Sequence, residues 1–236
     1  MSKNAASSPR QQRRAVIKKR KALIGFLGIL ICAACAGVYA LMRYQHTSPQ
    51  RLANACSQDI SSLSSTHDAD GDGIDDQHDI LESALTYINT RPKYKSAYYQ
   101  GGYPTDGYGV CTDLVAEALR LSGYDLQQLV DTDIRLNPGA YDVASPDSNI
   151  DYRRVKNLQV WFARHAIKLS SDPHDIDQWQ GGDIVIFKNH IGIVSDHRNA
   201  DGVPYVIHHQ GPWQKAFEED ILEKRSDIVG HYRISQ

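Results

Sequence analysis

The sequence predicts an α+β fold with a small antiparallel sheet, preceded by a transmembrane helix. Three observations carry this prediction. An apolar run without charge stands near the N-terminus. Helical spacing of apolar residues then dominates up to about residue 169. From residue 183 onward, short strand patterns follow one another with turn residues between them.

The N-terminal segment predicts a single-pass membrane anchor. Residues 1–21 form a basic tail with eight Lys and Arg and no acid, and residues 22–42 carry no charge. At about 1.5 Å per residue this run can cross a bilayer, and the basic flank keeps the N-terminus in the cytoplasm. The C-terminal domain would then lie in the periplasm, outside the inner membrane. The alternative is a cleaved secretory signal with an A-x-A-like site at 38–40, which would leave a secreted protein.

The charge balance beyond the tail excludes one class of partner. Residues 22–236 contain 18 basic and 28 acidic residues. Nucleic-acid binding requires clustered positive charge, so we expect no nucleic-acid partner.

A polar linker and an acidic loop are predicted next. Residues 43–66 are rich in Ser, Gln, Thr and Asn and show little periodicity. Residues 67–80 resemble the calcium loops of EF-hands, dockerins and thrombospondin type 3 repeats. A solvated acidic turn is the alternative. The sequence predicts a structural Ca²⁺ whose ligands are Asp68, Asp70, Asp72, Asp76 and Asp79, with the backbone carbonyl of Ile74.

Three amphipathic helices are predicted before the strands. Their apolar residues recur at helical spacing from Ile80 to Ile88, over 112–121, and between residues 152 and 169. The third helix is expected to bury Val155, Leu158, Trp161 and Phe162. We expect Arg153 and Arg154 on its solvated face, and the alternative is that they bind a substrate carboxylate.

Cys111 stands at the start of the helix predicted from Thr112. A thiol with a pKa of about 8.5 is only slightly ionised at neutral pH, and a helix N-terminus or a protonated histidine can lower that pKa. The alternative is an inert, buried thiol. Cys56 also lies outside the apolar run, but within the predicted linker, so we expect no disulfide between the two.

Two strand segments supply histidines that could serve such a thiol. His190 opens "HIGIVSD", and His208 and His209 end "YVIHH". On neighbouring antiparallel strands, His190 and His208 could lie side by side. Strand alternation lets only one of His208 and His209 face the helix. A nucleophile, a base and an orienting group would then be assembled.

These segments resemble the NlpC-type cysteine peptidases of bacterial cell walls, a papain-like superfamily. The resemblance rests on "YYQGGYPTDGYGVCTDLV", "GGDIVIF", "HIGIV" and "VIHH", and it covers roughly residues 80–236. It points to a secreted subgroup with a G-V-C-T-D core. It implies a papain-like, NlpC-type domain over residues 81–236, with Cys111 as nucleophile, His190 as general base and His208 orienting that base. Tyr98 would contact the substrate.

One departure from the family pattern concerns Asp113, because Cys-Thr-Asp replaces the usual Cys-Ser-Gly. This carboxylate would either oppose thiolate formation or bind a substrate amine. The resemblance implies a membrane-anchored periplasmic hydrolase that cleaves amide bonds in peptidoglycan peptide stems. The alternatives are an amidase or acyltransferase acting on another substrate, and a catalytically silent module that binds the cell wall.

Overall fold

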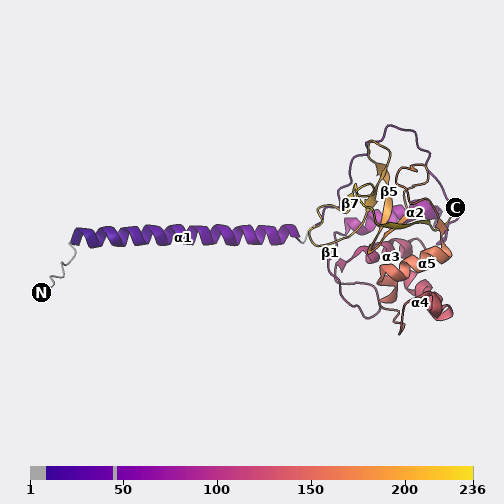
Figure 1. Ribbon diagram of the computed structural model, residues 1–236, viewed down its shortest axis with the longest axis horizontal. Helices are drawn as coiled ribbons and strands as arrows, with labels where there is room; N and C mark the ends of the chain where they lie inside the picture. The colour runs from indigo at the N-terminus through magenta and orange to yellow at the C-terminus, as the bar shows by residue number, and fades with distance from the viewer. Residues whose placement is uncertain (1–8, 45–46, 236) are drawn as a thin grey trace. The chain divides into compact units, whose positions relative to one another are not determined.

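The computed structural model describes residues 9–44 and 47–235, which belong to two compact units divided after Tyr44. The described part of the first unit is one helix, α1 (Pro9–Tyr44), drawn in indigo in Figure 1. Its segment Ile17–Met42 has a mean hydropathy of 2.3 and is long and apolar enough to cross a membrane. A membrane anchor and a signal sequence share this character.

A six-stranded sheet forms the centre of the described part of the second unit. Its spatial order is β3-β8-β4-β5-β6-β7, and all neighbours in it are antiparallel. The strands are β3 (Ile167–Lys168), β4 (Ile184–Phe187), β5 (His190–Arg198), β6 (Pro204–Ile207), β7 (Glu218–Glu219) and β8 (Ile228–Arg233). A separate parallel pair consists of β1 (Lys93–Tyr94) and β2 (Tyr108–Gly109).

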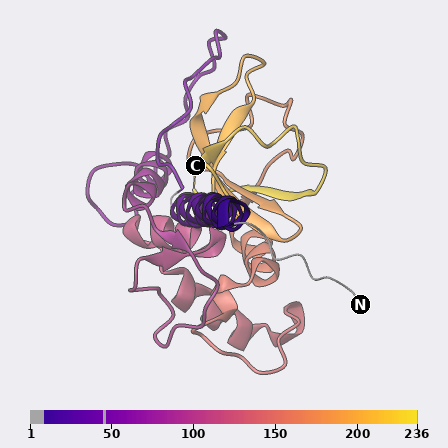
Figure 2. The same cartoon turned by 90° about the vertical axis from the view of Figure 1, so that its left-hand side faces the viewer.

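The helices cover one face of this sheet (Figures 1 and 2). They are α2 (Asp76–Asn89), α3 (Cys111–Leu121), α4 (Leu126–Leu136) and α5 (Val155–His165), with the short 3₁₀ helices η1 (Pro138–Ala140) and η2 (Asp151–Arg153). Ile184 and Ile186 of β4 face the helices, whereas Val185 and Phe187 belong to a smaller apolar cluster on the opposite face. Both faces of β4 are therefore buried, which explains its continuous apolar sequence.

The predicted order of helices first and antiparallel strands afterwards is confirmed. The helix predicted from Thr112 begins one residue earlier, at Cys111. The helix predicted between residues 152 and 169 is shorter, because η2 precedes it and β3 follows it.

Residues 47–66, predicted as part of a linker, lie along the sheet instead, and we call them the strap. Ser48 forms a parallel bridge with Ala216. Arg51 donates to Glu218 Oε1 at 3.2 Å and to Ser195 Oγ at 2.9 Å. Glu218 is only 1% exposed, so the strap supplies the cation for a buried carboxylate. The segment lacks periodicity because individual backbone and polar side-chain hydrogen bonds, and not a continuous apolar face, attach it.

Candidate active site

The turn before α3 sets the position of Cys111. Gly109 has no room for a side chain, because a Cβ there would lie 2.2 Å from the Tyr87 hydroxyl. Val110 is extended and precedes the first helical residue, Cys111. Asp113 Oδ2 accepts the Val110 N–H at 2.8 Å, as a residue at this helix position does in a capping box. The thiol therefore stands at the positive end of the α3 dipole.

The surroundings of Cys111 keep its thiol neutral. Burial raises the pKa of Cys111 to about 11, although hydrogen bonds from the backbone N–H groups of Ile191 and Thr112 act in the opposite direction. Ile191 is the residue after His190, so the sulfur lies beside the first residues of β5.

His190 and His208 are brought together by the pairing of β5 and β6. His190 Nε2 lies 2.9 Å from His208 Nδ1, and both side chains are buried. Gly192 permits this approach, because a Cβ there would lie 2.6 Å from Val206 Cγ1 and 3.2 Å from His208 Cβ. Burial, followed by the neighbouring His208, lowers the pKa of His190 to about 3. This imidazole is neutral at physiological pH.

The thiol and the histidine pair reach the start of β5 from different sides. The His190 ring stacks with that of Phe187, 5.9 Å between centroids, on the face opposite to α3. Within residues 47–235, the hydrogen bonds of the His190 ring include none to Cys111. Cys111 instead packs against the core on the helical face.

Strand alternation lets only one of His208 and His209 face the helices, and in the structure that residue is His209. Its ring centroid lies 5.4 Å from that of Tyr94 and 5.0 Å from that of Phe217. Neither of its ring nitrogens has a hydrogen-bond partner among the described residues. Burial lowers the pKa of His209 to about 4. Burial, and after it the charge of Cys111, raises the pKa of Tyr94, so Tyr94 adjoins both groups.

Asp113 and Arg153 form a buried ion pair. Arg153 Nε and Nη2 donate to the two carboxylate oxygens at 2.6 and 2.9 Å, and the side chains are 3% and 2% exposed. This arrangement argues against the predicted contact of Asp113 with a substrate amine, because both oxygens already have donors. The expectation that Arg153 lies on a solvated face is wrong; only its neighbour Arg154 is largely exposed.

Tyr98 remains accessible on the loop before α3. Its side chain is 57% exposed, and its hydroxyl donates to Asp147 Oδ2 at 3.2 Å and accepts from Asn149 Nδ2 at 3.0 Å. No contact in the described residues joins Tyr98 to Cys111.

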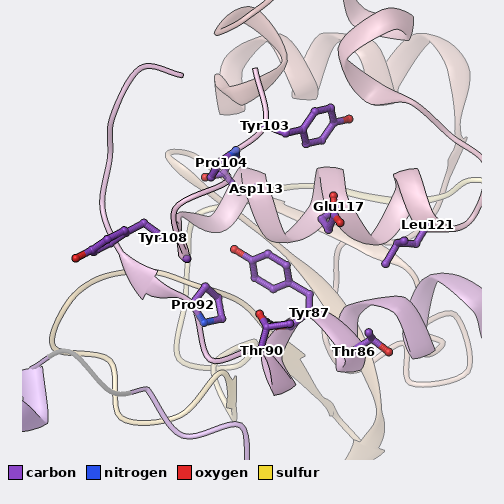
Figure 3. Close-up of a pocket in the computed structure, with 11 residues that line it drawn as sticks. Thr86, Tyr87, Thr90, Pro92, Tyr103, Pro104, Tyr108, Asp113, Glu117 and Leu121 are labelled. Atoms are coloured by element: carbon purple, nitrogen blue, oxygen red, sulfur yellow. Dashed lines mark hydrogen bonds between the residues drawn. The ribbon is translucent and has the colours of Figure 1, made fainter. Parts of the chain in front are cut away.

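A pocket of about 220 Å³ lies between α2 and α3, close to the start of α3 (Figure 3). Tyr87 projects between the two helices, and its buried hydroxyl has no hydrogen-bond partner among the described residues. The pocket is lined by Thr86, Tyr87, Thr90, Pro92, Tyr103, Pro104, Gly107, Tyr108, Asp113, Glu117 and Leu121. Three of these residues are tyrosines, and residue spacing alone did not reveal that they share a pocket.

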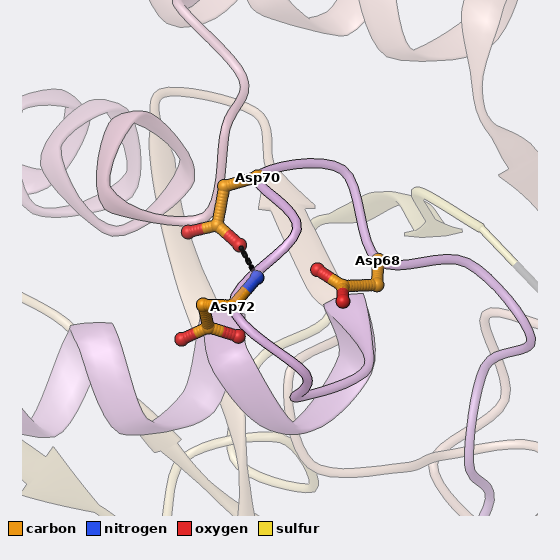
Figure 4. A group of neighbouring side chains, drawn as sticks. All are labelled: Asp68, Asp70 and Asp72. Atoms are coloured by element: carbon orange, nitrogen blue, oxygen red, sulfur yellow. Dashed lines mark hydrogen bonds between the residues drawn. The ribbon is translucent and has the colours of Figure 1, made fainter.

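The acidic loop brings three of its predicted ligands together (Figure 4). Carboxylate oxygens of Asp68, Asp70 and Asp72 lie within 4.8 Å of one another, and all three residues are exposed. Asp68 accepts the N–H groups of Gly71 and Gly73 at 2.8 and 2.9 Å, which folds the loop around its own carboxylate. Three hard oxygen donors at this separation fit a calcium ion.

Of the three other predicted ligands, Asp79 lies near the cluster and Asp76 does not face it, whereas Ile74 belongs to the loop itself. Burial, and also the charges of Asp70 and Asp72, raises the pKa of Asp79, which places this carboxyl near the cluster. The prediction that Asp76 binds calcium is corrected by the structure. Asp76 is 2% exposed and accepts hydrogen bonds from Ala69 N and Ser235 Oγ. Its side chain ties the loop to the domain, so it is unavailable as a ligand. Ile74 donates its N–H to Asp72 Oδ1 at 2.8 Å.

Comparison with known proteins places the domain in a family. A family described as "Domain of unknown function (DUF1287)" matches residues 81–234. The chain belongs to this DUF1287 family. One relative, from Escherichia coli (strain K12), is the "Uncharacterized protein YijF", which is 44% identical over 153 residues, or 60% of this chain and 72% of the relative. No solved structure matches the chain. The DUF1287 match includes α3, β5 and β6, and so contains Cys111, His190 and His208.

Proposed function

We propose that the protein is a membrane-anchored cysteine hydrolase that cleaves amide bonds, with peptidoglycan peptide stems as its substrate. One observation supports this most strongly. The Cys111 thiol stands at the N-terminus of α3 beside the N–H of Ile191, the residue that follows His190, and His190 Nε2 is held by His208. The resemblance to NlpC-type, papain-like peptidases supplies the substrate class.

In this proposal the resting site is uncharged. The pKa of Cys111 is about 11 and that of His190 about 3, so thiol and imidazole are both neutral near pH 7. Proton transfer from sulfur to His190 would accompany the attack and would not precede it. The side chain of Cys111 would have to turn toward the His190 side of β5 to make the contact, and a bound substrate would favour that rotamer.

The covalent step follows from these positions. Cys111 Sγ would attack the amide carbonyl while His190 accepts the thiol proton. The N–H groups at the start of α3, with that of Ile191, are the donors nearest to the developing oxyanion. His190 would return the proton to the leaving amine, and water would hydrolyse the thioester with His190 again as base.

The remaining parts of the chain would support this chemistry. Helix α1 would hold the domain at the inner membrane with residues 45–236 in the periplasm, unless cleavage after 38–40 releases a secreted domain. The mass of the mature chain separates these outcomes. Asp68, Asp70, Asp72 and Asp79 would bind a structural calcium ion that takes no part in catalysis.

Digestion of purified peptidoglycan by the full chain in detergent tests the proposal. Mass spectrometry of the released muropeptides would identify the bond cleaved. Cys111→Ala is expected to abolish release, whereas Cys56→Ala, which removes the other free thiol of the second unit, should leave it unchanged.

Two other outcomes have different meanings. Equal digestion by wild type and Cys111→Ala would contradict the enzyme proposal. Binding to peptidoglycan without digestion by either form would favour a wall-binding module. Transfer of the acyl group to an added amine would favour the acyltransferase alternative.

A further inference from the structure

A carboxylate that the sequence analysis did not single out joins the histidine pair. Glu219 Oε2 lies 3.1 Å from His208 Nε2. Glu219 ends the edge strand β7, where it pairs with Val206 of β6. Its side chain is 33% exposed, whereas that of His208 is fully buried. A chain of contacts thus runs from Glu219 through His208 to His190.

With Glu219 ionised and His208 neutral, the chemistry of the three groups allows one direction for these hydrogen bonds. An ionised carboxylate can only accept, so His208 must carry its proton on Nε2. A neutral imidazole has one N–H, which leaves His208 Nδ1 as an acceptor. His190 Nε2 must then donate across the 2.9 Å contact to His208 Nδ1. His190 is left with its lone pair on Nδ1.

Gln214 also lies within hydrogen-bond distance of His208 Nε2, but its amide hydrogens have other acceptors. Its Nε2 lies 3.3 Å from His208 Nε2, but its two amide hydrogens go to His208 O at 3.0 Å and Ala216 O at 2.8 Å. Its Oε1 accepts the N–H of Gln210 at 2.6 Å. These three partners fix the amide orientation, because a flipped amide would place its oxygen against two carbonyls.

We infer that Glu219 is a positioning residue that fixes the tautomers of both histidines and so presents His190 Nδ1 as the proton acceptor. Its role in hydrolysis rests on the proposed function. In that reaction Nδ1 accepts the thiol proton, while the Nε2–H of His190 stays bonded to His208. The positive charge that forms on His190 is then stabilised through His208 by the carboxylate, as in other carboxylate–imidazole chains.

Nuclear magnetic resonance of the full chain in detergent, with isotope-labelled histidine, tests the tautomers without any substrate. Two-bond proton–nitrogen correlations show which ring nitrogen carries the proton. At neutral pH, both His190 and His208 are expected to be protonated on Nε2. Glu219→Ala should convert His208 to a mixture of tautomers. Glu219→Gln keeps an acceptor oxygen and should restore the wild-type pattern.

Asp220→Ala is the matched control, because Asp220 follows Glu219, is 31% exposed and pairs with Lys224 instead of a histidine. It should leave the spectra unchanged. A proton on Nδ1 of His208, or identical spectra for wild type and Glu219→Ala, would overturn the inference.

Activity measurements separate this inference from the proposed function. If the muropeptide assay succeeds, Glu219→Ala should lower kcat about tenfold with KM unchanged, a smaller loss than removal of the base itself. The expected tautomers in a chain without hydrolytic activity would uphold the inference and contradict the proposed function. Activity that depends on Cys111, together with the opposite tautomers, would support the proposed function and contradict the inference about Glu219.

Discussion

Arg153 donates two hydrogen bonds to the carboxylate of Asp113 inside the domain, and this pair joins η2 to the first turn of α3. The two residues are far apart in sequence, but their side chains are almost completely buried. The carboxylate also holds the N–H of Val110, the residue just before the candidate nucleophile. The ion pair therefore fixes the backbone that presents Cys111.

Breaking this pair should destabilise the domain strongly. Arg153→Met leaves a buried carboxylate without its cation, and we expect the free energy of unfolding to fall by about 3–5 kcal/mol. Asp113→Leu combined with Arg153→Met removes both charges and should recover much of this loss. Urea unfolding of the two variants measures the difference. Equal destabilisation by the single and double variants would contradict the expectation that the unpaired Asp113 carboxylate causes the loss.

Alkylation of Cys111 should require alkaline pH. Because burial raises the pKa of Cys111 to about 11, the thiolate fraction and the rate with iodoacetamide should rise about tenfold per pH unit from neutral pH to about pH 10. Mass spectrometry of the peptide containing Cys111 measures this rate, with the Cys56 peptide of the same sample as control. A plateau near pH 7 would instead reveal a preformed thiolate–imidazolium pair.

Acid should destabilise the domain through its buried histidines. The pKa of His209 falls from 6.5 in the unfolded chain to about 4 in the folded one, and that of His190 to about 3. The unfolded state therefore binds more protons as pH falls through this window. Each histidine should cost roughly 1.4 kcal/mol of stability per pH unit within it.

His209→Leu isolates one of these contributions. The leucine cannot be protonated, so stability should depend less steeply on pH between about 6.5 and 4. It also removes a polar ring that has no hydrogen-bond partner among the described residues, so stability at pH 7 should change little. Denaturant unfolding at several pH values provides the comparison. An unchanged slope would mean that folding does not lower the pKa of His209.

Calcium should raise the melting temperature of the full chain. Binding to the folded state alone stabilises it by about 2.7 kcal/mol when calcium exceeds its Kd a hundredfold. Asp70→Asn weakens the cluster of Asp68, Asp70 and Asp72 and should remove most of the calcium response. Asp76→Asn should lower the melting temperature equally with and without calcium, because Asp76 binds protein groups. A melting temperature of the wild-type chain that does not change when a chelator is added would contradict the calcium site.

Periodicity predicted the helices because their apolar residues recur every three or four positions on the buried face. Strand β4 was recognisable instead as a short, continuous apolar run between turn residues, because both of its faces are buried. The strap could not be predicted, since its attachment depends on single contacts such as that of Arg51 with Glu218. No local pattern records a partner so distant in sequence.

The candidate site was also predictable only in part. The adjacency of His190 and His208 follows from a hairpin and the next strand, whose pairing the sequence indicates. The burial of Arg153 could not be foreseen, because it depends on how η2 folds back onto α3. Asp76 also matched the calcium-loop spacing, yet the start of α2 turns its side chain toward the domain.

The strap determines where an expressed fragment of the protein should begin. The family match starts at residue 81, but a protein produced from that point would retain the buried carboxylate of Glu218 and lose Arg51, its counterion. Such a fragment is expected to precipitate or to be degraded during expression. Soluble material for crystallisation should begin no later than residue 47, so that the whole edge of the sheet stays covered.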